Sequence, residues 1–436
     1  MPDIQQTLFI LILFAAAYLI YKRISQIKKN ILLGKPGERK GNSKQRLKNM
    51  LLVAFGQKKM FKKPLPALLH FMVYIGFLVI NIEVLEFIID GLAGTHRIFS
   101  GFLGPAYALL MNMFEFLAIG VLLSCIVFLV RRNILKVKRF HLAEMTSWPK
   151  LDANIILITE IVLMLAILTM NATDQILQTK GVDHYPYSGS FFFSSMLIPF
   201  FDGFNAFTLI FIERFAWWFH IIGILGFALY ITYSKHLHIF LAFPNTYFAD
   251  LEPKGKIEAM ASVTNEVKLM LGLEGTESQE PVARFGAKDV NDLEWKSIMD
   301  AYSCTECGRC TSECPANQTG KKLSPRKIMM DVRDRSEEIG KSIASGGKGL
   351  EDGKFLLGDF TTKEEINACT ACNACVEACP VLINPLKIIL EMRRYISMEE
   401  SGSPKEWNTM FQNIETSFNP WKFPPADRIN WSKETL

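Results

Sequence analysis

Five long apolar runs occupy the first 240 of the 436 residues, at positions 7–21, 66–89, 103–130, 153–171 and 215–233. A helix of about 18–25 apolar residues can cross the hydrocarbon core of a bilayer, which is about 30 Å thick. We therefore predict five transmembrane helices. The first run is short enough to be read as a signal peptide, but basic residues follow it and do not precede it. We interpret it as a retained membrane anchor.

The basic residues between the runs predict an orientation. Residues 22–63 hold fourteen Lys and Arg and one acidic residue, and residues 131–150 hold six and one. Short loops rich in Lys and Arg stay in the cytoplasm. We expect a multi-pass protein of the cell (inner) membrane, with its N-terminus outside and the region after the fifth helix in the cytoplasm. The net charge of +5 is then a topological signal, and we expect membrane lipid and no nucleic acid as a partner.

Beyond residue 240 the apolar runs become short, and Gly, Pro and charged residues increase. This change predicts an all-α bundle of five transmembrane helices followed by a mainly α-helical soluble domain. We divide the chain into a membrane domain (1–240), a connector (241–295), a cysteine-rich domain (296–400) and a C-terminal tail (401–436).

Eight of the nine cysteines form two copies of the motif C-x2-C-x2-C-x3-C-P. This is the spacing of bacterial two-cluster ferredoxins, in which the fourth cysteine of each motif ligates the other cluster. Disulfides are disfavoured in the cytoplasm, and zinc usually takes two separated pairs of cysteines. We therefore predict two [4Fe–4S] clusters. Their ligands would be Cys304, Cys307, Cys310 and Cys379 for cluster 1, and Cys369, Cys372, Cys375 and Cys314 for cluster 2.

Histidines at the ends of the apolar runs predict haem. Haem b takes two axial imidazoles, and topology pairs His70 with His238 near the cytoplasmic face. If the fifth helix continues through His238, eighteen residues make five turns, so His220 shares a face with His238 at a distance of about 27 Å. His220 would then serve an outer haem, with His96 as a tentative partner. His236, rotated by about 160° from that face, is also tentative. The prediction is one haem b, or two.

The chain resembles known families in both halves. His70, the W-W-F-H of Trp217–His220 and the S-K-H-L-H of Ser234–His238 resemble the nitrate reductase gamma-subunit family, and within it the cytochrome b subunits of heterodisulfide reductase (E type) and of sulfite-reduction complexes (M type). The C-P-A-N-Q-T-G-K-K-L-S-P-R and C-P-V-L-I-N-P-L segments are similar to the C-type iron–sulfur subunit of heterodisulfide reductase. The resemblance implies a cytochrome b-like membrane domain fused to a two-cluster domain.

The sequence departs from these families at two points. Members with two haems carry two histidines on the second helix, whereas this chain has His70 alone, which favours one haem. Their catalytic subunits carry adjacent Cys-Cys pairs, and none occurs here. We therefore expect the substrate site on a separate cytoplasmic subunit, either Cys-rich like the B-type and D-type subunits of heterodisulfide reductase or a flavoprotein. The catalytic residues are unknown.

Together these features predict an electron-transfer subunit that relays electrons between a cytoplasmic redox partner and menaquinone or ubiquinone. Glu83, Glu86, Glu115 and Glu160 lie in apolar runs, where they are candidates for handling the protons of quinone chemistry or for structural hydrogen bonds to Asn or Tyr. Two alternatives are open. One is a membrane-anchored iron–sulfur sensor or assembly protein without haem, and the other is a redox-driven ion pump.

Overall fold

The computed structural model describes residues 4–37, 39, 41–273, 284–427 and 429–433. The described residues are mainly helical, and their only β-type pairings are two isolated bridges. Five helices are long and apolar enough to cross a membrane, which confirms the predicted all-α architecture. They are α1 (Ile4–Ile31), α3 (Pro64–Ala93), α5 (Pro105–Leu129), α6 (Ser147–Thr179) and α9 (Ala206–Ile231).

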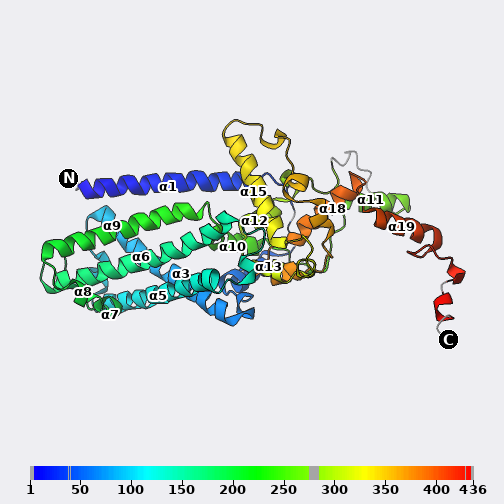
Figure 1. Ribbon diagram of the computed structural model, residues 1–436. Coiled ribbons are helices and arrows are strands. Elements are labelled where there is room, and N and C mark those ends of the chain that lie inside the picture. Colours follow the sequence, from blue (N-terminus) through cyan, green and yellow to red (C-terminus); the bar gives the residue numbers. More distant parts are fainter. Residues whose placement is uncertain (1–3, 38, 40, 274–283, 428, 434–436) are drawn as a thin grey trace.

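Four of these helices form a bundle. The helix α6 packs against α9 and α5, and α5 packs against α3, while α1 lies along α3 and α9 (Figure 1). Their buried faces meet in apolar clusters such as Phe87, Ile167 and Trp217. At the end of the bundle far from the soluble domain lie the short helices α4 (Ile98–Leu103), α7 (Phe192–Ser195) and α8 (Ile198–Phe201).

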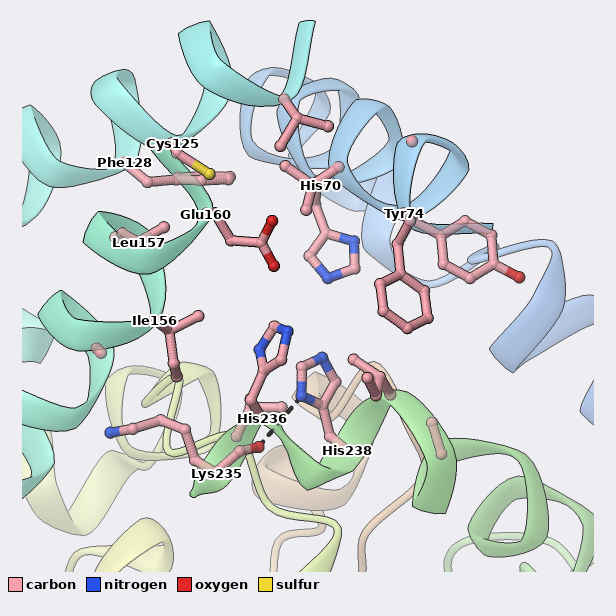
Figure 2. A pocket seen from close by; sticks show the side chains of 18 of the residues that line it. His70, Tyr74, Cys125, Phe128, Ile156, Leu157, Glu160, Lys235, His236 and His238 are labelled. Atoms are coloured by element: carbon pink, nitrogen blue, oxygen red, sulfur yellow. Dashed lines mark hydrogen bonds between the residues drawn. The ribbon is translucent and has the colours of Figure 1, made fainter. Parts of the chain in front are cut away.

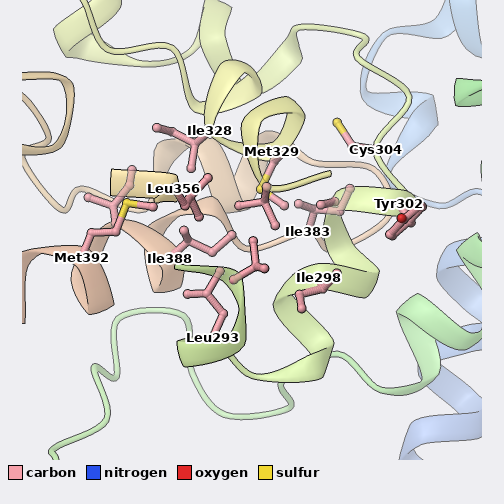
Figure 3. Close-up of a cluster of buried hydrophobic side chains, with 14 of the residues drawn as sticks. Leu293, Ile298, Tyr302, Cys304, Ile328, Met329, Leu356, Ile383, Ile388 and Met392 are labelled. Atoms are coloured by element: carbon pink, nitrogen blue, oxygen red, sulfur yellow. The ribbon is translucent and has the colours of Figure 1, made fainter. Parts of the chain in front are cut away.

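The soluble domain caps the other end of the bundle (Figure 1). Its core gathers Leu293 and Ile298 with Ile328, Ile388 and Met392 from later helices (Figure 3). Its helices are α12 (Trp295–Tyr302), α13 (Arg309–Ser312), α14 (Pro315–Gln318), α15 (Pro325–Ala344), α16 (Lys363–Asn367), α17 (Ala374–Ala378) and α18 (Pro385–Met398). The helices α11 (Ala261–Met270) and α19 (Lys405–Ser417) have no buried residue.

The C-terminal part of the expected connector belongs to this core. Ala287, Val290 and Leu293 are fully buried within it. Lys35, which follows α1, pairs through its backbone with Leu293 and Trp295, with N···O distances of 2.7 and 3.0 Å. The domain therefore begins before residue 296, because the apolar residues that close its core precede α12.

The core does not stop at the membrane part. Ile27, Ile156, Phe227 and Ile231 from α1, α6 and α9 belong to the same buried cluster as the soluble domain. Glu337 of α15 accepts two hydrogen bonds from Arg23 of α1, at 2.8 and 3.0 Å. The two parts of the chain are thus joined by apolar packing and by charged contacts.

The fifth membrane helix ends earlier than expected. The helix α9 stops at Ile231, and a 3₁₀ turn (Lys235–Leu237) leads into α10 (His238–Tyr247). The carboxylate of Asp152 on α6 fixes this turn, because it accepts from the Ser234 hydroxyl at 2.6 Å and the Lys235 amide at 3.2 Å. The expectation of one continuous helix from His220 to His238, with both on one face, is therefore wrong.

Candidate redox centres

A cavity of about 430 Å³ lies where the bundle meets the soluble domain. His70, His220, His236 and His238 all line it, and so does Glu160. Its other boundary comes from the cysteine-rich domain, through Thr305, Glu306, Cys307, Arg309, Pro380 and Val381. The same space therefore borders histidines of the membrane part and the loops that carry the cluster ligands.

His70 and His238 face each other across this cavity (Figure 2). Their ring centroids are 6.3 Å apart, and the planes of the two rings are inclined by 44°. An imidazole nitrogen binds a metal at about 2 Å, so two axial ligands of one metal have centroids roughly 6 Å apart. The spacing therefore fits a pair of axial ligands.

The hydrogen bonds of these histidines leave the same nitrogen available on each ring. The Nδ1 atom of His70 lies 3.1 Å from Oε1 of Gln57, and that of His238 lies 3.2 Å from the carbonyl oxygen of Lys235. Such a partner holds the proton on Nδ1 and leaves Nε2 free for a metal. The donor set and its supporting contacts fit bis-histidine ligation of haem iron.

His236 also enters the cavity. Its ring centroid lies 5.4 Å from that of His238 and 5.7 Å from that of Phe227. The turn that ends α9 brings both histidines to the same space, because the chain no longer follows the helical rotation that would separate them. His236 is thus close to the predicted pair.

His220 lies deeper in the bundle. Its Nδ1 atom is 3.0 Å from the carbonyl oxygen of Leu163, so its Nε2 atom is available to the cavity. His96 does not line this cavity. Its ring nitrogens lie 3.1 Å from Asp174 and 3.4 Å from Arg214, in a polar network near the opposite end of the bundle. The structure therefore does not bring His96 to the other histidines.

The four membrane glutamates differ in their surroundings. Glu86 accepts hydrogen bonds from Tyr107 and from the Phe99 amide, both at 2.9 Å. Glu115 accepts from Asn171 at 3.2 Å and from the Phe193 amide at 2.8 Å. These two carboxylates tie helices and loops together.

The other two glutamates keep capacity for a proton. Oε1 of Glu83 is buried and has no hydrogen-bond partner among the described residues. Glu160 projects into the cavity near His70 (Figure 2). A carboxyl group in such an apolar setting favours its neutral form, so Glu83 and Glu160 are the stronger candidates for proton exchange.

The eight motif cysteines fall into two neighbourhoods. Burial raises the pKa of Cys304 to about 12, and among its charged neighbours Cys307 and Cys379 raise it further. Burial likewise raises the pKa of Cys375 to about 12, with Cys369 and Cys314 adding to the rise. The neighbours of each thiol are those that the crossed ligand sets require.

The two cysteine loops repeat one backbone turn. Glu306 and Gly308 in the first loop, and Ala371 and Asn373 in the second, all have positive φ angles, between 53° and 69°. The turn directs amides at sulfur: the Glu306 amide donates to Cys304 Sγ at 3.4 Å and the Ala371 amide to Cys369 Sγ at 3.3 Å. Successive inward amides favour a bound anion such as a thiolate-ligated cluster.

The loop between α5 and α6 docks on the first cysteine loop. The fully buried Arg326 pairs with Glu144 at 2.6 Å and donates to the Arg139 carbonyl oxygen at 2.7 Å. Glu306 pairs with Lys235 at 2.6 Å, next to the histidine turn. These contacts hold the cluster 1 loop against the cavity.

Sequence reasoning missed several residues of this site. Gln57, Asp152 and Leu163 position the histidines, but nothing in their local sequence marks them. Arg309 stood inside the first cysteine motif, and its position between two ligands was a signal that could have been used.

Comparison with known proteins agrees with the cysteine chemistry. Residues 303–383 and 268–319 match two family models, each described as a 4Fe-4S dicluster domain. The chain is 29% identical to the probable iron-sulfur-binding oxidoreductase FadF of Bacillus subtilis, over 98% of this chain and 61% of that protein. It is 27% identical to the EtfAB:quinone oxidoreductase of Syntrophomonas wolfei, over 89% and 54%.

A shorter match covers 37% of this chain and 26% of a probable membrane-anchored ferredoxin of Chromohalobacter salexigens, at 29% identity. Similarity to the D-type subunit of heterodisulfide reductase and to a protein like its C-type subunit supports the resemblance in the cysteine region. No solved structure matches the chain significantly. The chain thus spans 61% and 54% of the length of the first two relatives. With its five apolar helices and dicluster domain, it is a membrane-anchored iron–sulfur protein of the electron-transfer type.

Proposed function

We propose that the chain relays electrons between a cytoplasmic redox partner and the quinone pool, through two [4Fe–4S] clusters and a b-type haem. The observation that carries this proposal is the shared cavity. It is lined by His70 and His238 on the membrane side and by Cys307 and Pro380 on the cluster side.

The residues divide the work in this proposal. His70 and His238 would hold the haem iron through Nε2, with Gln57 and the Lys235 carbonyl fixing their rings. His236 or His220 would serve a second site, and His96 is the weakest candidate because Asp174 and Arg214 already engage it. The haem, when bound, supplies a one-electron centre inside the bilayer.

The proposed ligands of cluster 1 are Cys304, Cys307, Cys310 and Cys379, and those of cluster 2 are Cys369, Cys372, Cys375 and Cys314. Cluster 1 then lies on the cavity side, because Cys307 and Pro380 line it. Cluster 2 has its own surroundings of Leu323, Leu386 and Ile389. This order supports a relay in which the second cluster meets the partner and the first meets the haem.

The proposed orientation puts the clusters in the cytoplasm. The two loops rich in Lys and Arg both contact the cysteine-rich domain, for instance through Lys62 with Glu377 at 2.5 Å and Arg326 with Glu144. Basic loops remain on the cytoplasmic side, so the clusters share that side. The partner would be a flavoprotein or a Cys-rich subunit, as the names of the relatives suggest.

Quinone reduction takes up protons, and quinol oxidation releases them. Glu160 in the cavity and Glu83 deeper in the bundle would exchange these protons. The haem-free sensor and the ion pump remain as alternatives, but neither explains two opposed histidines with their Nδ1 atoms engaged.

The test uses membranes that contain the full chain. We expect a b-type reduced-minus-oxidised spectrum that is bleached when a quinone analogue is added after reduction. His70→Ala and His238→Ala should each abolish the spectrum, whereas His184→Ala, in an exposed loop, should leave it intact. A wild-type membrane without a b-type spectrum, but with both clusters, would support the sensor instead.

A further inference from the structure

Arg309 is a buried cation without a counterion in the described part of the chain. Its residue is 7% exposed, and no carboxylate or hydrogen-bond acceptor among the described residues pairs with its guanidinium. A guanidinium stays charged at any physiological pH, and a buried charge without a partner is strongly unfavourable. The position therefore calls for an anion that is not part of the polypeptide.

The surroundings of Arg309 show where that anion would be. Arg309 lines the histidine cavity and lies within electrostatic reach of the His70 ring. Arg139, from the loop between α5 and α6, lines the same cavity, and its buried Nε atom also lacks an acceptor. Two arginines from separate segments thus offer unused donors to one space.

The net charge of this side of the cavity is positive. Arg131, Arg132 and Lys235 also line it, while its acidic neighbour Glu306 is already paired with Lys235 and Arg333. A guanidinium matches the planar, two-oxygen geometry of a carboxylate. The chemistry that these donors fit is a carboxylate, or a pair of carboxylates, entering from the cavity.

We propose that Arg309 and Arg139 bind the two propionate carboxylates of the haem that His70 and His238 ligate. This inference rests on the proposed function, since it needs haem in the cavity. The arginines stand on the cluster side of the cavity, next to Cys307 in the loop that Arg309 shares. They would fix the rotation of the macrocycle, with its propionate edge toward cluster 1.

The experiment compares two haems that differ only in these carboxylates. The full chain, produced without haem, is titrated with protohaem and with protohaem dimethyl ester, whose carboxylates carry no charge. We expect the wild type to bind protohaem at least tenfold more tightly than the ester. In Arg309→Gln and in Arg139→Gln this preference should fall several-fold, and Arg309→Lys should keep part of it.

Arg46→Gln is the matched control. Arg46 is also buried, but it donates to the carbonyl oxygens of Tyr247 and Ala249, away from the histidine cavity. It should keep the wild-type preference. Iron and sulfide content report whether each variant retains its clusters, and Arg139→Gln leaves both cysteine motifs untouched if Arg309→Gln loses a cluster.

The outcomes separate the two proposals. A wild type that binds haem but does not distinguish the ester, or arginine variants that keep the full preference, would overturn this inference and leave the haem proposal standing. A change confined to the potential of cluster 1 would also overturn it, because Arg309 would then serve the cluster. A wild type that binds no haem at all would overturn both.

Discussion

The imidazoles of His70 on α3 and His238 at the start of α10 stand 6.3 Å apart, each with Nδ1 held by an oxygen of the protein. The arrangement depends on two local features, the buried Gln57 and the turn that Asp152 fixes. Both can be changed without touching a histidine.

Replacing Gln57 tests the support of His70. Gln57→Leu removes the acceptor from the Nδ1 atom, so the ring loses its fixed tautomer and orientation. Loss of such a partner typically weakens metal binding about 10–100-fold. We expect weaker haem retention of that order in dialysis against a haem acceptor protein. Gln412→Leu, on the exposed face of α19, should behave as the wild type, and equal retention in both variants would contradict the assignment.

Replacing Asp152 tests the turn. Asp152→Ala removes the acceptor for Ser234, the Lys235 amide and Tyr230 together. The segment that carries His236 and His238 should then loosen, and the absorption band of the haem should broaden and weaken. Asp183→Ala, in an exposed loop, is the control. An unchanged spectrum in Asp152→Ala would mean that α10 alone positions His238.

The crossed ligation can be read from two cysteine variants. Cys379→Ser should alter the electron paramagnetic resonance signal of the cluster bound by Cys304, Cys307 and Cys310. Cys314→Ser should alter the other signal, because the fourth ligand of each motif serves the opposite cluster. Cys125→Ser, within α5, should change neither. If each variant disturbs the cluster of its own motif, the ligands are not crossed.

The joint between α1 and α15 should contribute to stability. Glu337→Gln weakens the paired hydrogen bonds from Arg23 and the bond from Tyr302, which has an O···O distance of 2.6 Å. Hydrogen bonds to a charged group contribute about 1–3 kcal/mol. We expect a lower midpoint of thermal unfolding in detergent, whereas the exposed Glu351→Gln should unfold as the wild type. Equal midpoints would show that apolar packing alone holds the joint.

The same carboxylate predicts a pH dependence. Burial would raise the pKa of Glu337, but hydrogen bonds from Arg23 and Tyr302 outweigh it and hold the pKa below its ordinary value. The unfolded chain then binds more protons than the native protein, so this contribution is complete above pH ~4.3 and is lost as the pH falls through the native pKa. The midpoint difference between wild type and Glu337→Gln should therefore be constant near neutral pH and shrink on acidification.

The sequence was sufficient for the parts of the fold that repeat a physical rule. Uninterrupted apolar runs predicted the five long helices, because a helix must satisfy its own backbone in lipid. The motifs from Cys304 and from Cys369 predicted a dicluster domain, which the family models confirm. The pairing of His70 with His238 followed from topology, and the structure places the two rings face to face.

The remaining features depend on contacts between distant segments. The end of α9 could not be predicted, because Asp152 on another helix fixes the turn after Ile231. His236 was expected to point away for the same reason. The roles of Glu86 and Glu115 as links between helices depend on Tyr107 and Asn171, which only the packed bundle brings near.

The buried cluster that runs from Ile27 and Phe227 into Ile328 and Met392 has a consequence for biogenesis. A ribosome releases the membrane helices long before it releases the second cysteine motif, so the soluble domain must close upon helices that are already inserted. Part of its folding template is therefore the membrane part itself. Expressed without residues 4–240, the cysteine-rich region would present an apolar face to water, and it would become a target for proteases before iron reached it.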